Sequence, residues 1–257
     1  MSPEEFRSVV RQGKYTGTTH TCCRGYARTN LVIVPREYAF DFSLFCHRNP
    51  GPCPVLDVTD PGDPHPKLMA PDADLRTDLP QYRVFKDGQV TDEPTDISKY
   101  WREDLVAFLF GCAASVRWAF EDANVRHRTT GVYRTTIRCV PAGRFYGPMA
   151  VTCTLVRGSR AVVRSVQIGS RHLFQHGPPI HIGDPAAIGI QDLCHPDLSG
   201  SPNKVIAPQE PDEVALFWAC GVTPQLVALE AKVPFMITHY PAHMFVTDHL
   251  AEELAVL

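Results

Sequence analysis

Apolar residues along the chain follow two spacings, which together predict an alternation of strands and helices. Residues 30–35 and 55–58 are short aliphatic runs bounded by proline or turn-forming residues, as in buried strands. Residues 38–47 place apolar side chains at helical spacing, and residues 100–120 are predicted to form a longer helix. Strands and helices are therefore expected in turn from the start of the chain.

The second half continues this pattern, with a stretch rich in strands in its middle. Two strand-to-helix units are expected near residues 179–187 and 214–227, before a last strand at residues 234–238. Period-two and helical spacings also predict two strands and one helix, at residues 133–139, 149–155 and 159–172.

Local signals mark three further segments. Ser2 followed by Pro3 and two acids is typical of a helix start, and Asp87-Gly88 between apolar strands predicts a hairpin turn. Residues 60–80 hold many prolines and charges without regular spacing. A connection of this kind is usually functional or disordered, and we favour a functional role.

Apolar strands alternating with helices predict an α/β fold, with a mixed, largely parallel sheet layered with helices. The strand-rich middle interrupts the alternation and predicts an additional, smaller α+β subdomain. We therefore expect a main α/β subdomain from residues 1–125 and 205–257, with residues 126–204 inserted as the smaller one.

Composition excludes several classes of protein. The formal net charge is -3 with interspersed signs, so nucleic acid is not an expected partner. No apolar run reaches the roughly 20 residues of a membrane-spanning helix, so no membrane association is expected. Nine cysteines without any CxxC pair argue against a disulfide framework and favour the cytoplasm. The chain lacks GxGxxG, P-loop, GxSxG and HExxH motifs, and no cofactor or metal is expected.

The segment from Trp218 to Gln225 is the first candidate site. A strand end, Gly221 and a Thr223-Pro224 helix start would gather backbone N–H groups that suit an anion or oxyanion. Cys220 would lie beside them, where a thiol pKa can be lowered. The alternative is an ordinary strand-to-helix turn with a buried cysteine and a cap at Thr223.

The segment from His176 to Pro185 is the second candidate site. His181 is a candidate catalytic residue and Asp184 a candidate substrate-binding residue at another helix start. A core histidine and an ordinary helix cap are the alternatives. In a parallel sheet, the junctions near Asp184 and Gly221 would face one pocket at the carboxyl ends of their strands.

Histidines near the carboxyl end and several charged residues complete the candidates. His239 and His243 have the spacing of zinc ligands on a helix, but Pro241 between them argues against a helix, so acid–base work is favoured. Arg76 and Arg134 are candidates for binding carboxylates, with ordinary ion pairs as the alternative, and Asp78 is a further candidate substrate-binding residue.

Many of these segments, in the same order, resemble the D-glutamate cyclase family, whose members are also called hydro-lyases. The resemblance runs from about residue 30 to residue 248. It includes Leu75-Arg-Thr-Asp-Leu-Pro80, Pro141-Ala-Gly-Arg-Phe145, His176-Gly177, His181-Ile-Gly-Asp-Pro185, Phe217-Trp-Ala-Cys-Gly-Val-Thr-Pro-Gln225 and His243-Met-Phe-Val-Thr-Asp248. The chain has Arg28 where glutamine is common in the family.

The resemblance implies two α/β-type subdomains and the dehydration of D-glutamate to 5-oxo-D-proline, with a small anionic amino acid as the partner. Arg76 or Arg134 would bind the α-carboxylate, the turn at Gly221 the reacting carboxyl group, and His181, His239 or His243 would move protons. Another hydro-lyase or amidohydrolase activity, and a non-catalytic binder of 5-oxoproline or an amino acid, are the alternatives. A homo-oligomer is left open.

Overall fold

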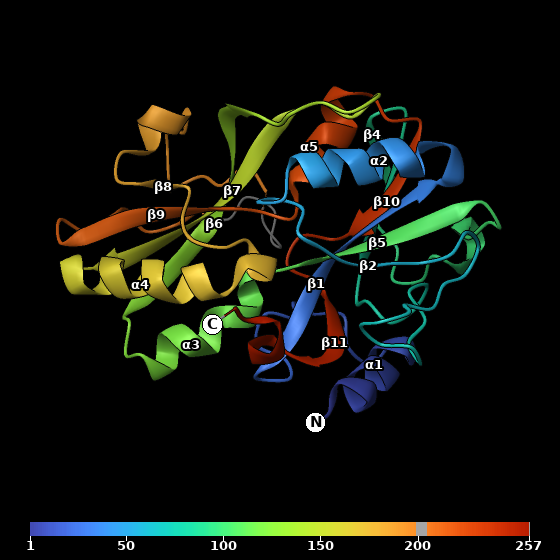
Figure 1. The fold of residues 1–257 in the computed structure, drawn as a ribbon, viewed down its shortest axis with the longest axis horizontal. Coiled ribbons are helices and arrows are strands. Elements are labelled where there is room, and N and C mark those ends of the chain that lie inside the picture. The colour runs from blue at the N-terminus through green and yellow to red at the C-terminus, as the bar shows by residue number, and fades with distance from the viewer. Residues whose placement is uncertain (199–204, 257) are drawn as a thin grey trace.

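The computed structural model describes residues 1–198 and 205–256. Within these residues the strands form two antiparallel sheets that lie side by side, the larger to the right and the smaller to the left in Figure 1. The expected largely parallel sheet is therefore wrong, because each recorded strand pairing is antiparallel.

Seven of the described strands form the larger sheet. They are β1 (Tyr26–Pro35), β2 (Val55–Val58), β3 (Tyr82–Lys86), β4 (Gln89–Asp92), β5 (Leu105–Gly111), β10 (Phe235–His239) and β11 (Phe245–Leu250). Their order is β2-β5-β1-β10-β3-β4, and β11 pairs with β1 outside this path. The strand β1 therefore has partners along both edges.

Both faces of the larger sheet are buried, which explains the continuous apolar runs of its strands. Leu31 and Ile33 point into one core and Val32 and Val34 into the other, as the two-residue period of a strand requires. Helix α2 (Arg36–Arg48) packs on the second of these faces, and irregular chain within residues 68–101 covers the first.

Four of the described strands form the smaller sheet, in the order β6-β7-β9-β8. They are β6 (His127–Arg138), β7 (Pro148–Arg157), β8 (His181–Ile182) and β9 (Glu213–Ala219). Helices α3 (Arg117–Asp122) and α4 (Ser159–Arg171) cover one face of this sheet, and residues 188–193 pack on the other.

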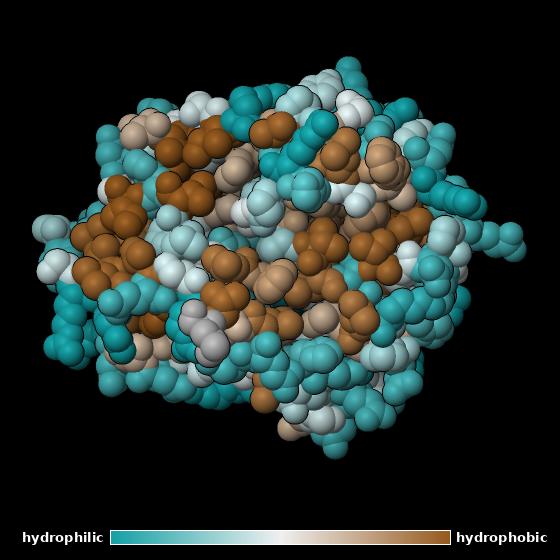
Figure 2. Space-filling model, viewed as in Figure 1, coloured by the Kyte–Doolittle hydropathy of each residue, from teal (hydrophilic) through white to brown (hydrophobic). Residues whose placement is uncertain are grey.

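Two more α-helices and five short 3-10 helices complete the described chain. They are α1 (Pro3–Arg11), α5 (Thr223–Glu230), η1 (Ser98–Tyr100), η2 (Ala113–Val116), η3 (Leu173–Gln175), η4 (Pro185–Ile188) and η5 (Ala251–Leu254). Helix α5 joins the sheets, because Leu226 packs on Ala150 of β7 while Val227 belongs to the core under α2. In Figure 2, hydrophobic residues gather over the smaller sheet and in the middle of the molecular face that is turned to the viewer.

Several expected elements are confirmed and others are wrong. Ser2 forms the predicted cap of α1, and Asp87 and Gly88 have positive φ in the predicted hairpin turn between β3 and β4. The helix predicted over residues 100–120 is wrong, because its apolar part is strand β5, and β11 was not expected.

The division into a main and an inserted subdomain stays a prediction. The smaller sheet includes β9, which lies beyond residue 205, and the expected boundary at 204 falls outside the described residues. None of the helices described is both long and apolar enough to span a bilayer.

Candidate functional site

The two junctions expected to share a pocket lie at opposite ends of one strand. His181 pairs with Phe217 and Ile182 with Leu216, antiparallel. Asp184 therefore lies beyond the start of β9, whereas Gly221 follows its end. The expectation of a common pocket is wrong, because it required parallel strands, whose carboxyl ends meet at one edge of the sheet.

His181 and Asp184 form part of the turn after β8. The Nε2 atom of His181 lies 2.7 Å from the carbonyl oxygen of Asp184, and its ring packs on Phe217 with centroids 5.6 Å apart. The Asp184 carboxylate accepts the Ala186 N–H at 2.9 Å and caps η4. These contacts match the structural alternative, and a catalytic role for either residue stays a prediction.

Each of the three charged candidates is already paired. Arg76 forms an ion pair with Asp74 at 2.7 Å, and the buried Asp78 carboxylate accepts two bonds from Arg11, at 2.6 and 2.7 Å. Arg134 is exposed on β6 and pairs with Glu230 at 2.8 Å. A substrate would have to displace these partners, so carboxylate binding by Arg76 and Arg134 and substrate binding by Asp78 stay predictions.

His243 is buried in a turn near the amino-terminal helix. Its Nδ1 lies 2.8 Å from the carbonyl oxygen of Pro241, and its Nε2 lies 3.2 Å from that of Thr16. Both ring nitrogens are therefore occupied by backbone of the protein. Among the described residues, no group of three His, Cys, Asp or Glu side chains has metal-binding geometry.

The place where the two sheets meet is organised around Asn30 of β1. Its carboxamide Nδ2 donates to the carbonyl oxygen of Gly111 at 2.8 Å, and its side chain lies against the α-carbon of Gly221. The end of β5 in turn contacts η3, since a Cβ on Gly111 would lie 1.5 Å from the Phe174 carbonyl oxygen. We call this place, formed by Asn30, Gly111–Cys112, Gln175–His176 and Cys220–Gly221, the sheet junction.

The backbone N–H groups of the Cys220 segment point at the Cys220 thiol, and anion binding by this segment stays a prediction. The thiol of Cys220 is approached by the N–H groups of Gly221 and Val222 and by the Thr152 side chain. Thr223 donates from Oγ1 to the Cys220 carbonyl oxygen at 2.7 Å, which holds the turn. Burial nevertheless raises the pKa of the Cys220 thiol, because desolvation outweighs these hydrogen bonds.

His239 presents a free N–H group beside β1, where it bonds the backbone of Leu31, the residue after Asn30. Its Nδ1 lies 3.2 Å from the Leu31 backbone nitrogen, whose N–H points at the ring, and 3.4 Å from the Leu31 carbonyl oxygen. The shorter contact makes Nδ1 an acceptor and places the ring proton on Nε2. That Nε2 is buried and has no hydrogen-bond partner among the described residues. Burial lowers the pKa of His239 to about 4, so the ring is neutral at pH 7.

His176, in contrast to His239, presents an unprotonated ring nitrogen, which can accept a proton. Its Nδ1 donates to the carbonyl oxygen of Gly51 at 2.8 Å, which leaves Nε2 unprotonated. In the part of the chain that the structure describes, this buried Nε2 also lacks a partner. Burial lowers the pKa of His176 to about 4. The residue has a φ of 78°, a left-handed conformation that is uncommon outside glycine and is often found at functional sites.

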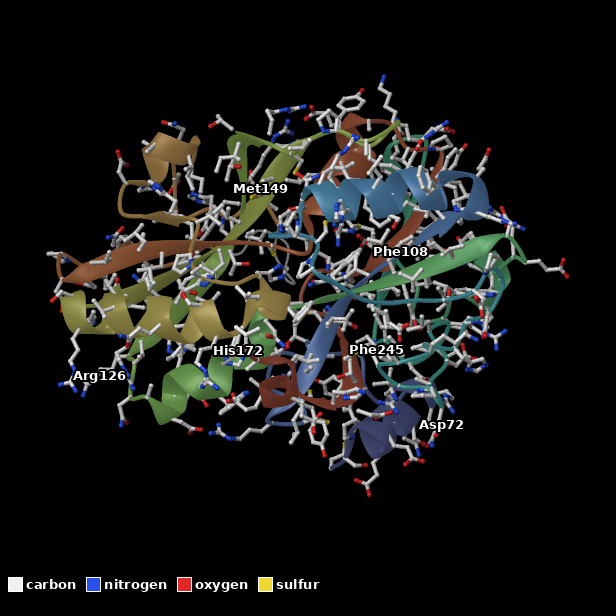
Figure 3. All side chains as sticks on the ribbon, in the orientation of Figure 1. Asp72, Phe108, Arg126, Met149, His172 and Phe245 are labelled. Carbon is white, nitrogen blue, oxygen red and sulfur yellow. The ribbon has the colours of Figure 1, made fainter. Side chains whose placement is uncertain are left out.

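Each of the two imidazoles is bonded to backbone that borders the sheet junction. Gly51, which accepts the His176 bond, lies against Ala219, where a Cβ on Gly51 would be 3.6 Å from the Ala219 Cβ. Leu31, which bonds His239, follows Asn30 in β1. Figure 3 shows the labelled His172, four residues before His176, at the end of α4 near the middle of the molecule.

Arg28 supplies a buried positive charge near the sheet junction. Its guanidinium donates to the carbonyl oxygens of Thr19, Tyr26 and Cys22, and its side chain forms no recorded ion pair with a described carboxylate. The residue is 2% exposed, and its charge acts on the Cys112 thiol. A buried cation without a counter-ion is unfavourable, so this part of the molecule favours an anion.

Sequence reasoning missed His176, Asn30 and Arg28 as site residues. His176 was part of the second candidate segment, and the glycine after it was the only local signal. Asn30 and Arg28 lie within a strand that is buried along almost its whole length, and polar residues there are a signal of a buried polar role.

The sequence matches known proteins over its whole length. The sequence model of the D-glutamate cyclase family matches residues 106–248. The "Putative hydro-lyase BLi00500/BL02808" of Bacillus licheniformis is 49% identical over 100% of this chain and 98% of its own. The "Putative hydro-lyase YcsI" of Bacillus subtilis is 48% identical over 100% of both chains.

Structural likeness to a solved protein is slight. A nitrogen repressor-like protein, MJ0159 from Methanococcus jannaschii, aligns with 96% of this chain and 94% of its own, at 9% identity and a TM-score of 0.39. The family model and the full-length relatives, in contrast, agree with each other. The chain therefore belongs to the D-glutamate cyclase family, a family of hydro-lyases.

Proposed function

We propose that this protein converts D-glutamate to 5-oxo-D-proline and water at the sheet junction. The observation that carries the proposal is the pair of buried, neutral imidazoles, His176 with a bare Nε2 and His239 with a free Nε2–H. One can accept a proton and the other can donate a hydrogen bond, which are the two functions that an intramolecular dehydration needs. Nine free cysteines support a cytoplasmic location.

The net negative charge of the substrate also favours the sheet junction as its binding site. Glutamate carries two carboxylates and one ammonium group, so it is a net anion. Arg28 provides a buried positive charge that no described carboxylate neutralises, whereas Arg76 and Arg134 are paired with Asp74 and Glu230. An anion is therefore stabilised more at the sheet junction than beside either of the paired arginines.

The proton steps balance without any other reactant. His176 Nε2 takes one proton from the α-ammonium group, and the neutral amine attacks the carbon of the side-chain carboxyl group. A C–N bond forms, and the nitrogen later loses a second proton. Both protons finally reach the departing oxygen, which leaves as water when its C–O bond breaks. The base at His176 returns its proton in this last step and is regenerated.

In this proposal His239 is the oxyanion donor. Its Nε2–H is held by the Leu31 bond to Nδ1 and does not need to turn when negative charge develops on the tetrahedral intermediate. The N–H groups of Gly221 and Val222 already approach Cys220 and lie at the same junction. A covalent role for Cys220 is not needed, because the substrate amine is a tethered nucleophile.

The test is direct. Purified, metal-stripped protein is incubated with D-glutamate and with L-glutamate, and 5-oxoproline is followed by mass spectrometry. We expect formation of 5-oxo-D-proline from D-glutamate, and none above the protein-free rate from L-glutamate. Thermal stabilisation by 5-oxo-D-proline without turnover would instead indicate a binding protein. Turnover of a hydroxy acid or an imide, with none of glutamate, would indicate another hydro-lyase or an amidohydrolase.

A further inference from the structure

Gln175 carries a buried side-chain amide that forms no hydrogen bond. The residue ends η3 and is 1% exposed. Neither its Oε1 nor its Nε2 atom has a hydrogen-bond partner within the described residues. An amide in this position has lost its bonds to water and gained none in the folded protein, which is unfavourable for folding. Stability therefore does not explain why a glutamine lies here.

The unpaired polar atoms of the described chain gather around this residue. Eight buried side-chain nitrogen and oxygen atoms lack a partner there, and four of the eight belong to His172, Gln175 and His176. Burial lowers the pKa of His172 and the neighbouring Gln175 side chain opposes this, although the two side chains do not meet in hydrogen-bonding geometry. Residues 172–176 thus hold a group of buried polar atoms that no other described group satisfies.

The turn that carries Gln175 lies between the sheet junction and the surface. A Cβ on Gly111, which belongs to the sheet junction, would lie 3.4 Å from the α-carbon of Gln175. The turn η3 also contacts η2 and α4. Leu173 and Phe174, in the same turn, are 50% and 44% exposed. One turn of 3-10 helix therefore separates the buried amide from solvent.

The unpaired atoms match both charged groups on the α-carbon of an amino acid. Gln175 Nε2 has two N–H bonds to donate, which suit a carboxylate. Gln175 Oε1 and the unprotonated Nε2 of the adjacent His176 are acceptors, which suit an ammonium group. A compound that has only carboxylates would satisfy the donors but leave both acceptors facing its own lone pairs. The set therefore favours an amino acid over a plain dicarboxylate.

We propose that Gln175 binds the ammonium and carboxylate groups on the α-carbon of the substrate, and that it makes the site selective for an amino acid over a dicarboxylic acid of the same length. The inference rests on the proposed function and adds the residue that recognises its substrate. Entry requires that η3 moves aside. Gln175 Oε1 then holds the ammonium group beside His176 Nε2, which accepts its proton.

The first test uses the unmodified protein and glutarate, which has the chain length and both carboxylates of glutamate but no amine. Glutarate carries one more net negative charge, so the positive charge of Arg28 alone would favour it over glutamate. We expect the opposite order, with D-glutamate bound about 10- to 100-fold more tightly. The concentration dependence of thermal stabilisation by each compound measures this. Equal or tighter binding of glutarate would overturn the inference.

The second test replaces Gln175 by methionine, which has a similar length and volume but no amide. Because the amide forms no hydrogen bond in the described chain, Gln175→Met should raise the melting temperature by about 2–5 °C. It should also raise the KM for D-glutamate by about tenfold or more and reduce the preference over glutarate. A glutamine with a purely structural role would not produce these opposite effects on stability and binding.

Gln167→Met is the matched control, because Gln167 is an exposed glutamine of α4 that contacts Arg164. It should change neither the KM nor the preference for D-glutamate. A Gln175→Met protein that melts at a lower temperature and keeps its KM would overturn this inference alone. Binding of D-glutamate that depends on Gln175, without formation of 5-oxoproline, would overturn the proposed cyclisation alone. Binding of neither compound by the unmodified protein would reject both.

Discussion

The carboxamide of Asn30 lies so close to Gly221 that a Cβ at residue 221 would be 2.1 Å from Asn30 Nδ2. The side chain cannot withdraw without breaking its bond to Gly111. We therefore expect Gly221→Ala to lower the free energy of unfolding by about 1–3 kcal/mol and to reduce turnover. Urea denaturation and the 5-oxoproline assay measure both effects.

Gly51→Ala is the matched control for that variant. A Cβ at residue 51 would lie 3.6 Å from the Ala219 Cβ, which is an ordinary contact. Its unfolding free energy should change by less than that of Gly221→Ala. Equal stability of the two variants would show that Asn30 has room to move.

His176→Asn removes the proposed base while it keeps the local backbone. Asparagine accepts a left-handed φ more readily than most residues, and its amide nitrogen can still donate to the Gly51 carbonyl oxygen. We expect turnover to fall by about 10²- to 10⁴-fold, with little change in melting temperature.

His195→Asn controls for a general effect of replacing a histidine, because His195 is exposed and pairs with Asp192. It should retain full turnover. A His176→Asn protein that turns over at the original rate would remove His176 from the mechanism.

Stability should depend on pH through the two buried imidazoles. His176 and His239 have pKa values lowered from 6.5 to about 4 by burial, so between these values the unfolded chain binds more protons than the folded one. The free energy of unfolding should thus fall as the pH drops from 6.5 to 4, by up to about 3 kcal/mol for each group. Urea unfolding at pH 7 and pH 5 measures this.

His239→Gln should flatten part of that dependence, because glutamine does not titrate. An equal slope in the variant and in the unmodified protein would mean that His239 is not the group responsible.

Arg28→Gln tests the buried charge. Removal of the charge should raise the KM for D-glutamate on the order of tenfold. A unit charge close to a bound anion contributes about 1–2 kcal/mol to the free energy of binding. The control is Arg157→Gln, an exposed arginine paired with Asp212. If KM is unchanged in a folded Arg28→Gln protein, the substrate anion is bound elsewhere.

The Asp78→Asn variant distinguishes a role of Asp78 in stability from a role in substrate binding. The Asp78 carboxylate is fully buried and holds Arg11 and the Asp74 N–H, so its loss should lower the unfolding free energy by about 2–3 kcal/mol. Asp212→Asn, at an exposed pair, should cost less than about 0.5 kcal/mol. A raised KM with unchanged stability would support the sequence-based role for Asp78.

Local structure was largely predictable from the sequence, whereas strand direction was not. The cap at Ser2 and the turn at Asp87-Gly88 depend on neighbouring residues and were correctly predicted. Strand β5 is buried on both faces, so its continuous apolar run has no two-residue period to distinguish it from a helix. Runs of this kind are typical of parallel sheets, but here irregular chain covers one face instead of a helix.

The site was only partly predictable for a related reason. The Cys220–Gly221 turn and His239 were candidates from the sequence because their motifs are local. His176 and Asn30 become site residues only when the ends of β5 and β9 are brought together, and that arrangement follows from the antiparallel pairing. Because the strands were expected to be parallel, Asp184 and Gly221 were predicted to share one pocket, and the sheet junction was not predicted.

The position of β1 has a consequence for biosynthesis. It pairs with β10 and β11, which lie about 200 residues later in the chain. During translation, one edge of β1 therefore stays unpaired until residues 235–250 leave the ribosome. Nascent chains that stall before β10 would expose the unpaired edge of β1, which is prone to aggregation. They should depend on chaperones far more than the folded protein does.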